Sequence, residues 1–227
     1  IWSLGNEAGD GENFMRMRNA ALELDAGRPI HYEGDFDLTK SDFISRMYPT
    51  ERVVEKLKNK QAIKESLFDS IANKLAADNK AVSADKYETK PVVYCEYAHA
   101  MQNSLGNFRE YVEDFETYDH MCGGFIWDYV DQALRVVENG TEKWLYGGDF
   151  DEGPTSYYFC ANGIIGADRV PHPSYYEVKK VYANMAVHPV NTESGVYRVE
   201  NKNLFVSLDE YALAWTVQVR GEIVQSG

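Results

Sequence analysis

Residues 91–101 read Pro91-Val92-Val93-Tyr94-Cys95-Glu96-Tyr97-Ala98-His99-Ala100-Met101, an almost continuous apolar run that gives way to polar residues at a glutamate. Such a run is typical of a strand that is covered on both faces of a parallel sheet. Residues 1–9 have the same form, because Ile1-Trp2-Ser3-Leu4-Gly5 leads into Asn6-Glu7. In a (β/α)8 barrel, side chains at the carboxyl ends of the strands converge over the barrel mouth. In such a barrel, Glu7 and Glu96 would both lie at that mouth.

The chain to about residue 185 alternates strand-like and helix-like segments. Strands are predicted at 1–7, 29–34, 43–48, 91–96 and 123–128. Apolar residues at helical spacing predict helices at 13–24, 51–75, 108–118 and 174–185. Two polar stretches without a period, 76–90 and 131–172, are expected to be irregular connections. This alternation is typical of an α/β protein with a parallel sheet.

The pattern changes beyond residue 185. Residues 196–200, 204–208 and 212–220 alternate with period two and have turn residues between them. We therefore predict two domains, an α/β domain over 1–185 and the start of an all-β domain over 186–227.

Composition narrows the range of partners. The 227 residues are 44 % hydrophobic, enough to bury a core in one or two domains. The net charge of −13, with no basic cluster to offset it, argues against nucleic acid and anionic membranes as partners. No apolar run reaches the roughly 18–20 residues of a membrane span. The three cysteines are odd in number, which favours buried, reduced thiols over a disulfide framework.

Five strands cannot close an eight-stranded barrel. Either the sheet is open, or three strands precede residue 1. Ile1-Trp2-Ser3-Leu4 already resembles the middle of a buried strand, so residue 1 is not expected to be the natural N-terminus. Two carboxylates at one barrel mouth are what glycoside hydrolysis requires, since one donates a proton and the other attacks the anomeric carbon.

Seven ordered motifs resemble the large bacterial β-galactosidases of glycoside hydrolase family 2. They are Trp2 to Gly9, Cys95 to Met101, Asn103 to Gly106, Gly123 to Asp128, Gly147 to Phe150, Phe159 to Gly163 and Asp168 to Pro173. An Asn-Glu pair alone would be a weak signal, but seven motifs in order over 1–185 are specific. The resemblance implies that 1–185 holds strands four to eight of a (β/α)8 TIM barrel. Residues 186–227 then begin a β-sandwich domain.

The resemblance also implies a retaining, double-displacement mechanism that cleaves terminal β-D-galactosyl residues, as in lactose. Glu96 would be the nucleophile. Glu7 would be the acid/base that protonates the departing oxygen and then deprotonates water. Tyr48 would hydrogen-bond the nucleophile and assist its departure. Retention requires the two carboxyl groups to lie about 5–5.5 Å apart.

The family pattern assigns three residues to the sugar. Asn6 would contact the 2-hydroxyl, His99 would bind galactosyl hydroxyls, and Trp127 would offer its ring face to the C–H surface of the sugar. Each residue also has an ordinary structural interpretation, as a loop asparagine, a core histidine or a core tryptophan.

Two metal ions follow from the same resemblance. Mg²⁺ would be shared by Glu7 with a glutamate and a histidine upstream of this chain. Na⁺, near the sugar 6-hydroxyl, would take the backbone oxygen of Phe159 and the side-chain oxygen of Asn162, with an upstream aspartate. Asn162 thereby also joins the substrate site.

Some expectations concern the whole protein. The intact enzyme is expected to be a homo-oligomer in the bacterial cytoplasm or periplasm. Residues 1–227 alone are expected to be inactive and prone to association, because they would expose strand edges that a closed barrel hides. The sequence departs from the family at Asp10, where histidine is frequent, and at Gln102, where glycine is common. The charged segment around 51–80 also matches poorly.

Two alternatives remain open at this point. Another family 2 activity, a β-glucuronidase or a β-mannosidase, would use the same mechanism. A glucuronidase should show Asn-Glu-Pro and basic residues for its carboxylate, whereas Ala8 follows Glu7 here. The other alternative is a non-catalytic carbohydrate-binding module, which would not need both glutamates with Asn6 and Tyr48.

Overall fold

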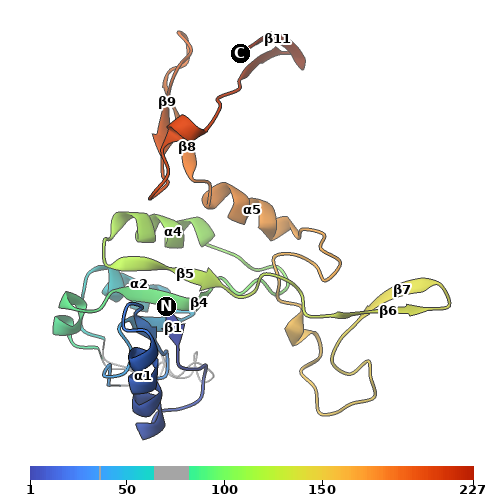
Figure 1. The fold of residues 1–227 in the computed structure, drawn as a ribbon. Coiled ribbons are helices and arrows are strands. Elements are labelled where there is room, and N and C mark those ends of the chain that lie inside the picture. The colour runs from blue at the N-terminus through green and yellow to red at the C-terminus, as the bar shows by residue number, and fades with distance from the viewer. Residues whose placement is uncertain (36, 64–81) are drawn as a thin grey trace. The chain divides into compact units, whose positions relative to one another are not determined.

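The structure, a computed structural model, describes residues 1–35, 37–63 and 82–227 (Figure 1). The chain divides into two compact units, Ile1–Val181 and Tyr182–Gly227. A domain boundary at residue 185 stays a prediction, because compactness alone does not define a domain.

The first unit contains five strands that pair in parallel. β1 (Trp2–Ser3) pairs with β2 (Ile30–His31). β3 (Ile44–Met47) pairs with β4 (Val92–Tyr97), which in turn pairs with β5 (Met121–Ile126). All five predicted strands are therefore present, each shorter than or shifted slightly from its predicted range, and all their pairings are parallel as the α/β pattern predicts.

The five strands form two sheets, one of β1–β2 and one of β3–β4–β5. Asp42 connects the end of β2 to the approach to β3. Its backbone N–H donates to the Ile30 carbonyl at 2.7 Å, and its carboxylate accepts the Ile30 N–H at 2.7 Å. The numbering of these strands as four to eight of a barrel stays a prediction.

Helices follow most of the strands. They are α1 (Glu12–Leu24), α2 (Glu51–Lys58), α4 (Phe108–Thr117) and α5 (Pro173–Val181). The predictions of helices at 13–24 and 108–118 are confirmed. The helix predicted over 174–185 ends earlier, at Val181, after the basic pair Lys179 and Lys180 that is typical of a helix end.

The helix predicted over 51–75 is correct only to Lys58 among the described residues. Lys60 adopts φ 52°, a left-handed conformation that ends a helix, and Ile63 then forms a bridge with Val82. Residues 64–75 lie outside the described residues, as do 76–81 of the predicted connection. The connection is not wholly irregular, since Ala84–Glu88 form the 3-10 helix η1.

Two apolar clusters support these elements. The larger one surrounds β3, β4 and β5 and includes Ile44, Val92, Tyr94, Tyr97 and Phe108. A smaller cluster of Leu4, Ile30 and Tyr32 lies under β1 and β2, with Phe14 of α1 packed against it. The strand ends that carry the predicted site residues are thus fixed by buried neighbours on the same strands.

The stretch 131–172, expected to be irregular, contains a β-hairpin of β6 (Leu134–Glu138) and β7 (Thr141–Leu145). The turn residues Asn139 and Gly140 have φ 50° and 77°. Positive φ at both central residues defines a type I′ turn, which Asn-Gly strongly favours. The expectation of an irregular connection is therefore wrong for residues 134–145. A short 3-10 helix, η2 (Tyr157–Cys160), follows.

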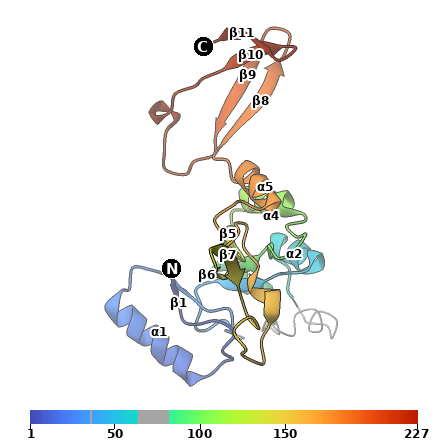
Figure 2. The same cartoon turned by 90° about the vertical axis from the view of Figure 1, so that its right-hand side faces the viewer.

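The second unit consists of two antiparallel ribbons (Figure 2). β8 (Met185–Asn191) pairs with β9 (Val196–Asn201), and β10 (Thr216–Val219) pairs with β11 (Glu222–Ser226). The strand predicted at 196–200 is confirmed, and the one predicted at 212–220 is confirmed in part.

The strand predicted at 204–208 is wrong. Phe205 is 96 % exposed, and the 3-10 helix η3 (Leu208–Glu210) follows directly. The segment alternates but pairs with no strand among the described residues, so its pattern has no ladder to stabilise it.

The structure also tests the predictions about the cysteines and about membrane-spanning segments. Cys95, Cys122 and Cys160 carry free thiols, as predicted. None of the three is buried, however, since Cys122 is exposed and Cys95 and Cys160 are half-buried, so the expectation of buried thiols is wrong. None of the described helices is both long enough and apolar enough to cross a membrane.

Candidate active site

A cavity of about 890 Å³ lies where β1, β3, β4 and β5 end. All eight residues predicted from the sequence line it, namely Asn6, Glu7, Tyr48, Glu96, His99, Trp127, Phe159 and Asn162. Strands far apart in sequence thus bring their carboxyl ends to one cavity, as expected for a barrel mouth. The roles of these residues stay predictions, but their convergence is a property of the fold.

Tyr48 is bonded twice to Glu96. Its hydroxyl donates to Glu96 Oε2 at 2.6 Å, and its backbone N–H donates to the Glu96 carbonyl at 3.0 Å. Tyr48 has φ 43°, an unfavourable conformation for a bulky residue that persists only where neighbours hold it. The main-chain bond between the ends of β3 and β4 therefore holds the phenol against the carboxylate.

Opposing effects act on the pKa of Glu96, and the net result is a rise. Burial raises the pKa of Glu96 above the ordinary carboxyl value, the Tyr48 hydrogen bond opposes this rise, and the charges of Glu7 and Glu33 add to it. Burial and the bond to Glu96 raise the pKa of Tyr48. The phenol therefore stays protonated and donates to the carboxylate.

Glu7 follows β1 and also has a left-handed backbone, with φ 48°. Its N–H donates to Glu33 Oε1 at 2.5 Å. The Glu7 side chain is exposed overall, yet partial burial and then the charge of Glu33 raise the pKa of Glu7. A raised pKa suits a carboxyl group that must hold a proton before donating it. Asn6 lies beside it on the cavity wall.

His99 and Trp127 present rings to the same cavity. The His99 ring lies 5.6 Å from the Tyr48 ring and 5.7 Å from the Phe159 ring, measured between centroids. Burial lowers the pKa of His99, which favours a neutral imidazole that can both donate to and accept from hydroxyl groups. Trp127 is 37 % exposed, which does not fit the interpretation as a core tryptophan.

Asn162 is a buried amide with one unsatisfied atom. Its Nδ2 donates to the Phe159 carbonyl at 3.1 Å, whereas its Oδ1 is buried and has no hydrogen-bond partner among the described residues. Its own carbonyl accepts the Asp128 N–H at 2.7 Å, which fixes the loop to the end of β5. A buried acceptor without a donor is costly unless a ligand or cation satisfies it.

The cavity has a further wall that the sequence did not predict. It includes Leu134 and Leu145 of the β6–β7 hairpin, Tyr146, Phe150 and Glu152 of the loop that follows, and Tyr157 at the start of η2. Asn139-Gly140 could have revealed the hairpin. The loop residues carried no comparable signal, because exposed tyrosines and a glutamate are ordinary in a surface loop.

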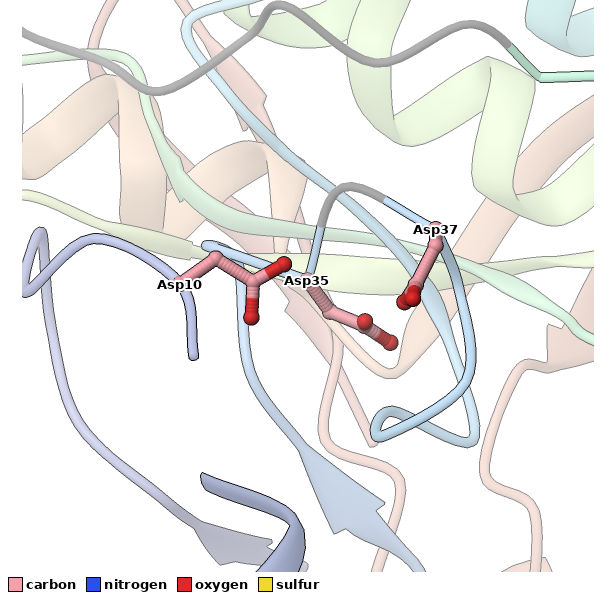
Figure 3. A group of neighbouring side chains, drawn as sticks. All are labelled: Asp10, Asp35 and Asp37. Atoms are coloured by element: carbon pink, nitrogen blue, oxygen red, sulfur yellow. The ribbon is translucent and has the colours of Figure 1, made fainter. Parts of the chain in front are cut away.

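Three aspartates gather near the loop that carries Glu7 (Figure 3). Oxygens of Asp10, Asp35 and Asp37 lie within 4.8 Å of one another. The Lys40 ammonium reaches all three, at 3.2, 3.4 and 2.9 Å respectively. Lys40 thus supplies the positive charge, and we assign no metal to this cluster. Asp10, which departs from the family pattern, is thereby explained as an ion-pair partner.

Comparison with known proteins places the chain in a family. Residues 1–187 match the TIM barrel domain of glycosyl hydrolases family 2. The chain therefore belongs to this family.

Curated relatives agree with this assignment. A β-galactosidase of Priestia megaterium is 41 % identical over 229 residues, covering 99 % of this chain. A β-galactosidase of Klebsiella pneumoniae is 37 % identical over all of it, and the β-galactosidase BgaC of Bifidobacterium adolescentis is 38 % identical. The chain spans only 20–21 % of the length of these relatives.

Solved structures resemble the chain more loosely. A β-galacturonidase from Eisenbergiella tayi covers 77 % of this chain, with 31 % of its own length aligned, at a TM-score of 0.42 and 19 % identity. A β-glucuronidase from Faecalibacterium prausnitzii covers 79 %, with 30 % of its own length aligned, at a TM-score of 0.43 and 17 % identity. Likenesses of this size do not decide a substrate.

Proposed function

We propose that this chain supplies both catalytic carboxylates of a retaining β-galactosidase that releases terminal β-D-galactosyl residues. The observation that carries the proposal is the convergence of Glu7, Glu96 and Tyr48 on one cavity, with the phenol bonded to Glu96 at 2.6 Å. Family membership and the β-galactosidase names of the curated relatives support the substrate.

The reaction divides into two displacements. In the first, a Glu96 oxygen bonds to the anomeric carbon while the bond to the departing oxygen breaks, and Glu7 gives its proton to that oxygen. In the second, Glu7 removes a proton from water, and the water oxygen displaces Glu96 from the sugar. The overall configuration is retained. The Tyr48 phenol stabilises the Glu96 carboxylate both before attack and as it leaves.

The remaining cavity residues would hold the sugar. Asn6, which lines the cavity together with Glu7, would contact the 2-hydroxyl through a bond that strengthens in the transition state. The neutral imidazole of His99 can bind hydroxyls as donor or acceptor. The partly exposed ring of Trp127 can cover an apolar face of the sugar.

The cavity lining favours a neutral sugar. No lysine or arginine is among the described residues that line it, whereas Glu7, Glu96 and Glu152 are all acidic. A uronic acid would bring a carboxylate into this negative field without a basic partner. This supports a galactoside over a glucuronide, and a mannoside stays open as the alternative.

The residues present fit Na⁺ in part. The Asn162 amide contacts the Phe159 carbonyl through its Nδ2, and its buried Oδ1 lacks a partner among the described residues, so both residues offer neutral oxygens of the kind that a hard cation prefers. A bound Na⁺ would supply a fixed positive charge for a sugar hydroxyl oxygen.

Glu7 fits Mg²⁺ through an exposed carboxylate beside the negative Glu33, where a divalent ion would offset repulsion. Its other ligands are expected outside this chain. Homo-oligomeric assembly and the cellular compartment stay predictions.

The test compares nitrophenyl β-galactoside, β-glucuronide and β-mannoside as substrates of the intact enzyme that carries this chain, beside a Glu96→Gln variant. We expect turnover of the galactoside that is lost in the variant. Turnover of another glycoside would overturn the substrate and keep the mechanism. A variant that keeps wild-type turnover would overturn Glu96 as nucleophile. No turnover of any glycoside, with Mg²⁺ and Na⁺ supplied, would favour a binding module instead.

A further inference from the structure

The backbone of Glu7 is held by a buried carboxylate. Glu33, two residues beyond β2, is only 4 % exposed, and its Oε1 accepts the Glu7 N–H at 2.5 Å. Glu7 has φ 48°, which is unfavourable for a residue with a side chain. This conformation persists only where other contacts fix it. The Glu33 bond acts directly on the residue whose side chain must face the departing oxygen.

Other contacts anchor the same loop, residues 5–11, but they lie further from Glu7. The Tyr32 hydroxyl donates to the Gly9 carbonyl, and the Tyr32 ring stacks on Phe14 at 4.1 Å. The Lys40 ammonium lies 3.2 Å from Asp10. These contacts fix where the loop runs. They leave the orientation of the Glu7 peptide to Glu33.

The choice of a carboxylate at this position is informative. Burying one carboxyl group beside another costs free energy through desolvation and repulsion. A carboxylate accepts an N–H more strongly than a neutral group does. Its second oxygen, Oε2, has no hydrogen-bond partner among the described residues, so this carboxylate is held for the Glu7 N–H that its Oε1 accepts.

We propose that Glu33 is a positioning residue, which orients the acid/base Glu7 by accepting its backbone N–H. This inference rests on the proposed function of Glu7. Without the bond, the Glu7 peptide can leave its left-handed conformation, and the carboxyl group then turns away from the departing oxygen. Glu33 itself is not among the described residues that line the cavity.

This role has a kinetic signature that a purely structural role lacks. A good leaving group such as 2,4-dinitrophenolate departs without a proton, whereas phenolate needs proton donation from Glu7. The first displacement, reported by kcat/KM, should therefore slow only for the substrate that needs the acid. A general loss of folded enzyme would slow both substrates in proportion.

The experiment measures kcat/KM for phenyl and 2,4-dinitrophenyl β-galactosides with the intact enzyme and Glu33→Ala. We expect a fall of about 10- to 100-fold for the phenyl substrate, the size typical of a misplaced catalytic group. The dinitrophenyl substrate should stay near the wild-type value. Glu33→Gln keeps an acceptor for the Glu7 N–H and should recover most of the loss.

Asp42→Ala is the matched control. Its carboxylate also accepts a backbone N–H, that of Ile30 at 2.7 Å, but it has no contact with Glu7. We expect lower thermal stability and an unchanged ratio between the two substrates. If Glu33→Ala does not fold, Glu33→Asp serves instead, because its shorter side chain withdraws the acceptor while keeping the charge.

Two results would overturn the inference. One is a proportional loss on both substrates in Glu33→Ala or Glu33→Asp. The other is a selective loss in Glu33→Gln as large as in Glu33→Ala, because the glutamine still offers an acceptor. A wild-type enzyme that cleaves no β-galactoside would instead contradict the proposed substrate. The same pair of leaving groups on the glycoside that it does cleave would then test Glu33.

Discussion

The Tyr48 hydroxyl donates to Glu96 Oε2 at 2.6 Å, although the two residues are 48 positions apart in the sequence. They meet because parallel pairing of β3 with β4 brings the end of one strand beside the end of the other. The bond joins a phenol whose pKa is raised to a carboxyl group whose pKa is also raised, with burial the largest cause in both. Because the ordinary pKa of a phenol, about 10, lies far above that of a carboxyl group, about 4.3, the shared proton stays on the phenol.

Replacing Tyr48 by Phe should change the pH dependence of activity. The nucleophile must be a carboxylate, so kcat/KM falls as the pH drops through the pKa of Glu96. The Tyr48 bond lowers that pKa, and its loss raises it. The acid limb of the profile should therefore move to higher pH. Loss of a hydrogen bond to a charged group, about 1.5–3 kcal/mol, should also lower kcat/KM about 10- to 100-fold.

The control for this prediction is Tyr87→Phe, which removes a phenol that donates to the Gln61 carbonyl outside the cavity. It should lower stability and leave the pH profile unchanged. An acid limb that stays in place in Tyr48→Phe would show that the phenol does not set the charge state of Glu96.

Asn162→Ala should abolish the response of the enzyme to Na⁺. The unsatisfied Oδ1 of Asn162 is the proposed ligand, so its removal should weaken Na⁺ affinity about tenfold or more. KM for a nitrophenyl β-galactoside is measured while Na⁺ replaces tetramethylammonium at constant ionic strength. Wild-type KM should fall with Na⁺, and the variant should hold a high, flat KM.

Asn59→Ala, at the exposed C-terminal cap of α2, provides the control and should respond to Na⁺ like the wild type. If Na⁺ lowers KM equally in Asn162→Ala, the cation binds elsewhere. The absence of a hydrogen-bond partner for Asn162 Oδ1 among the described residues would then need another explanation.

The strands and the site residues were predictable for different reasons. The strand at 91–96 is predictable because a short, almost continuous apolar run is typical of a strand covered on both faces of a parallel sheet. Glu7 and Glu96 were predictable because each follows an apolar strand, whereas the other cavity residues were predicted from the resemblance to the family. Their convergence required only that the strands be parallel.

Contacts between distant loops were not predictable in this way. Nothing near Glu33 marks it as the acceptor for an N–H 26 residues earlier, because that pairing depends on the turn after β1 meeting the turn after β2. Similarly, Lys40 appears in sequence as one more charged residue. Leu204 to Leu208 shows the opposite error, since alternation predicted a strand where no partner strand is described.

Lys40→Met should destabilise the first unit in a pH-dependent manner. Removing the ammonium leaves three carboxylates in repulsion, at a cost of about 2 kcal/mol, below the range for a fully buried pair because Asp37 is exposed. The Thr39 and Lys40 contacts lower the pKa of Asp37, so its contribution to stability is present at neutral pH and lost in acid. The variant should therefore differ most from wild type near neutral pH.

Thermal unfolding of the intact enzyme at pH 7 and at about pH 2.5, below the ordinary aspartate pKa of about 3.9, measures this difference. Lys143→Met is the control, because its pair with Glu138 is exposed and worth at most about 1 kcal/mol. A Lys40→Met penalty that is equal at both pH values would contradict an electrostatic role for Lys40.

Gly140→Val should weaken the wall of the cavity through the backbone alone. Gly140 has φ 77° in the type I′ turn, which a β-branched residue resists, yet a Cβ there would meet no atom within 4 Å. The strained turn loosens β6 and β7, whose residues Leu134 and Leu145 line the cavity. We expect KM for lactose to rise, because the loosened wall would bind the substrate less well. The value of kcat/KM for 2,4-dinitrophenyl β-galactoside should change less, because the wall is formed by other residues than Glu7 and Glu96.

Gly106→Ala is the control, because Gly106 also lies in open space but has no positive φ, and it should leave both kinetic constants unchanged. An unchanged KM for lactose in Gly140→Val, together with unaltered protease sensitivity at the hairpin, would mean that the turn does not control this wall.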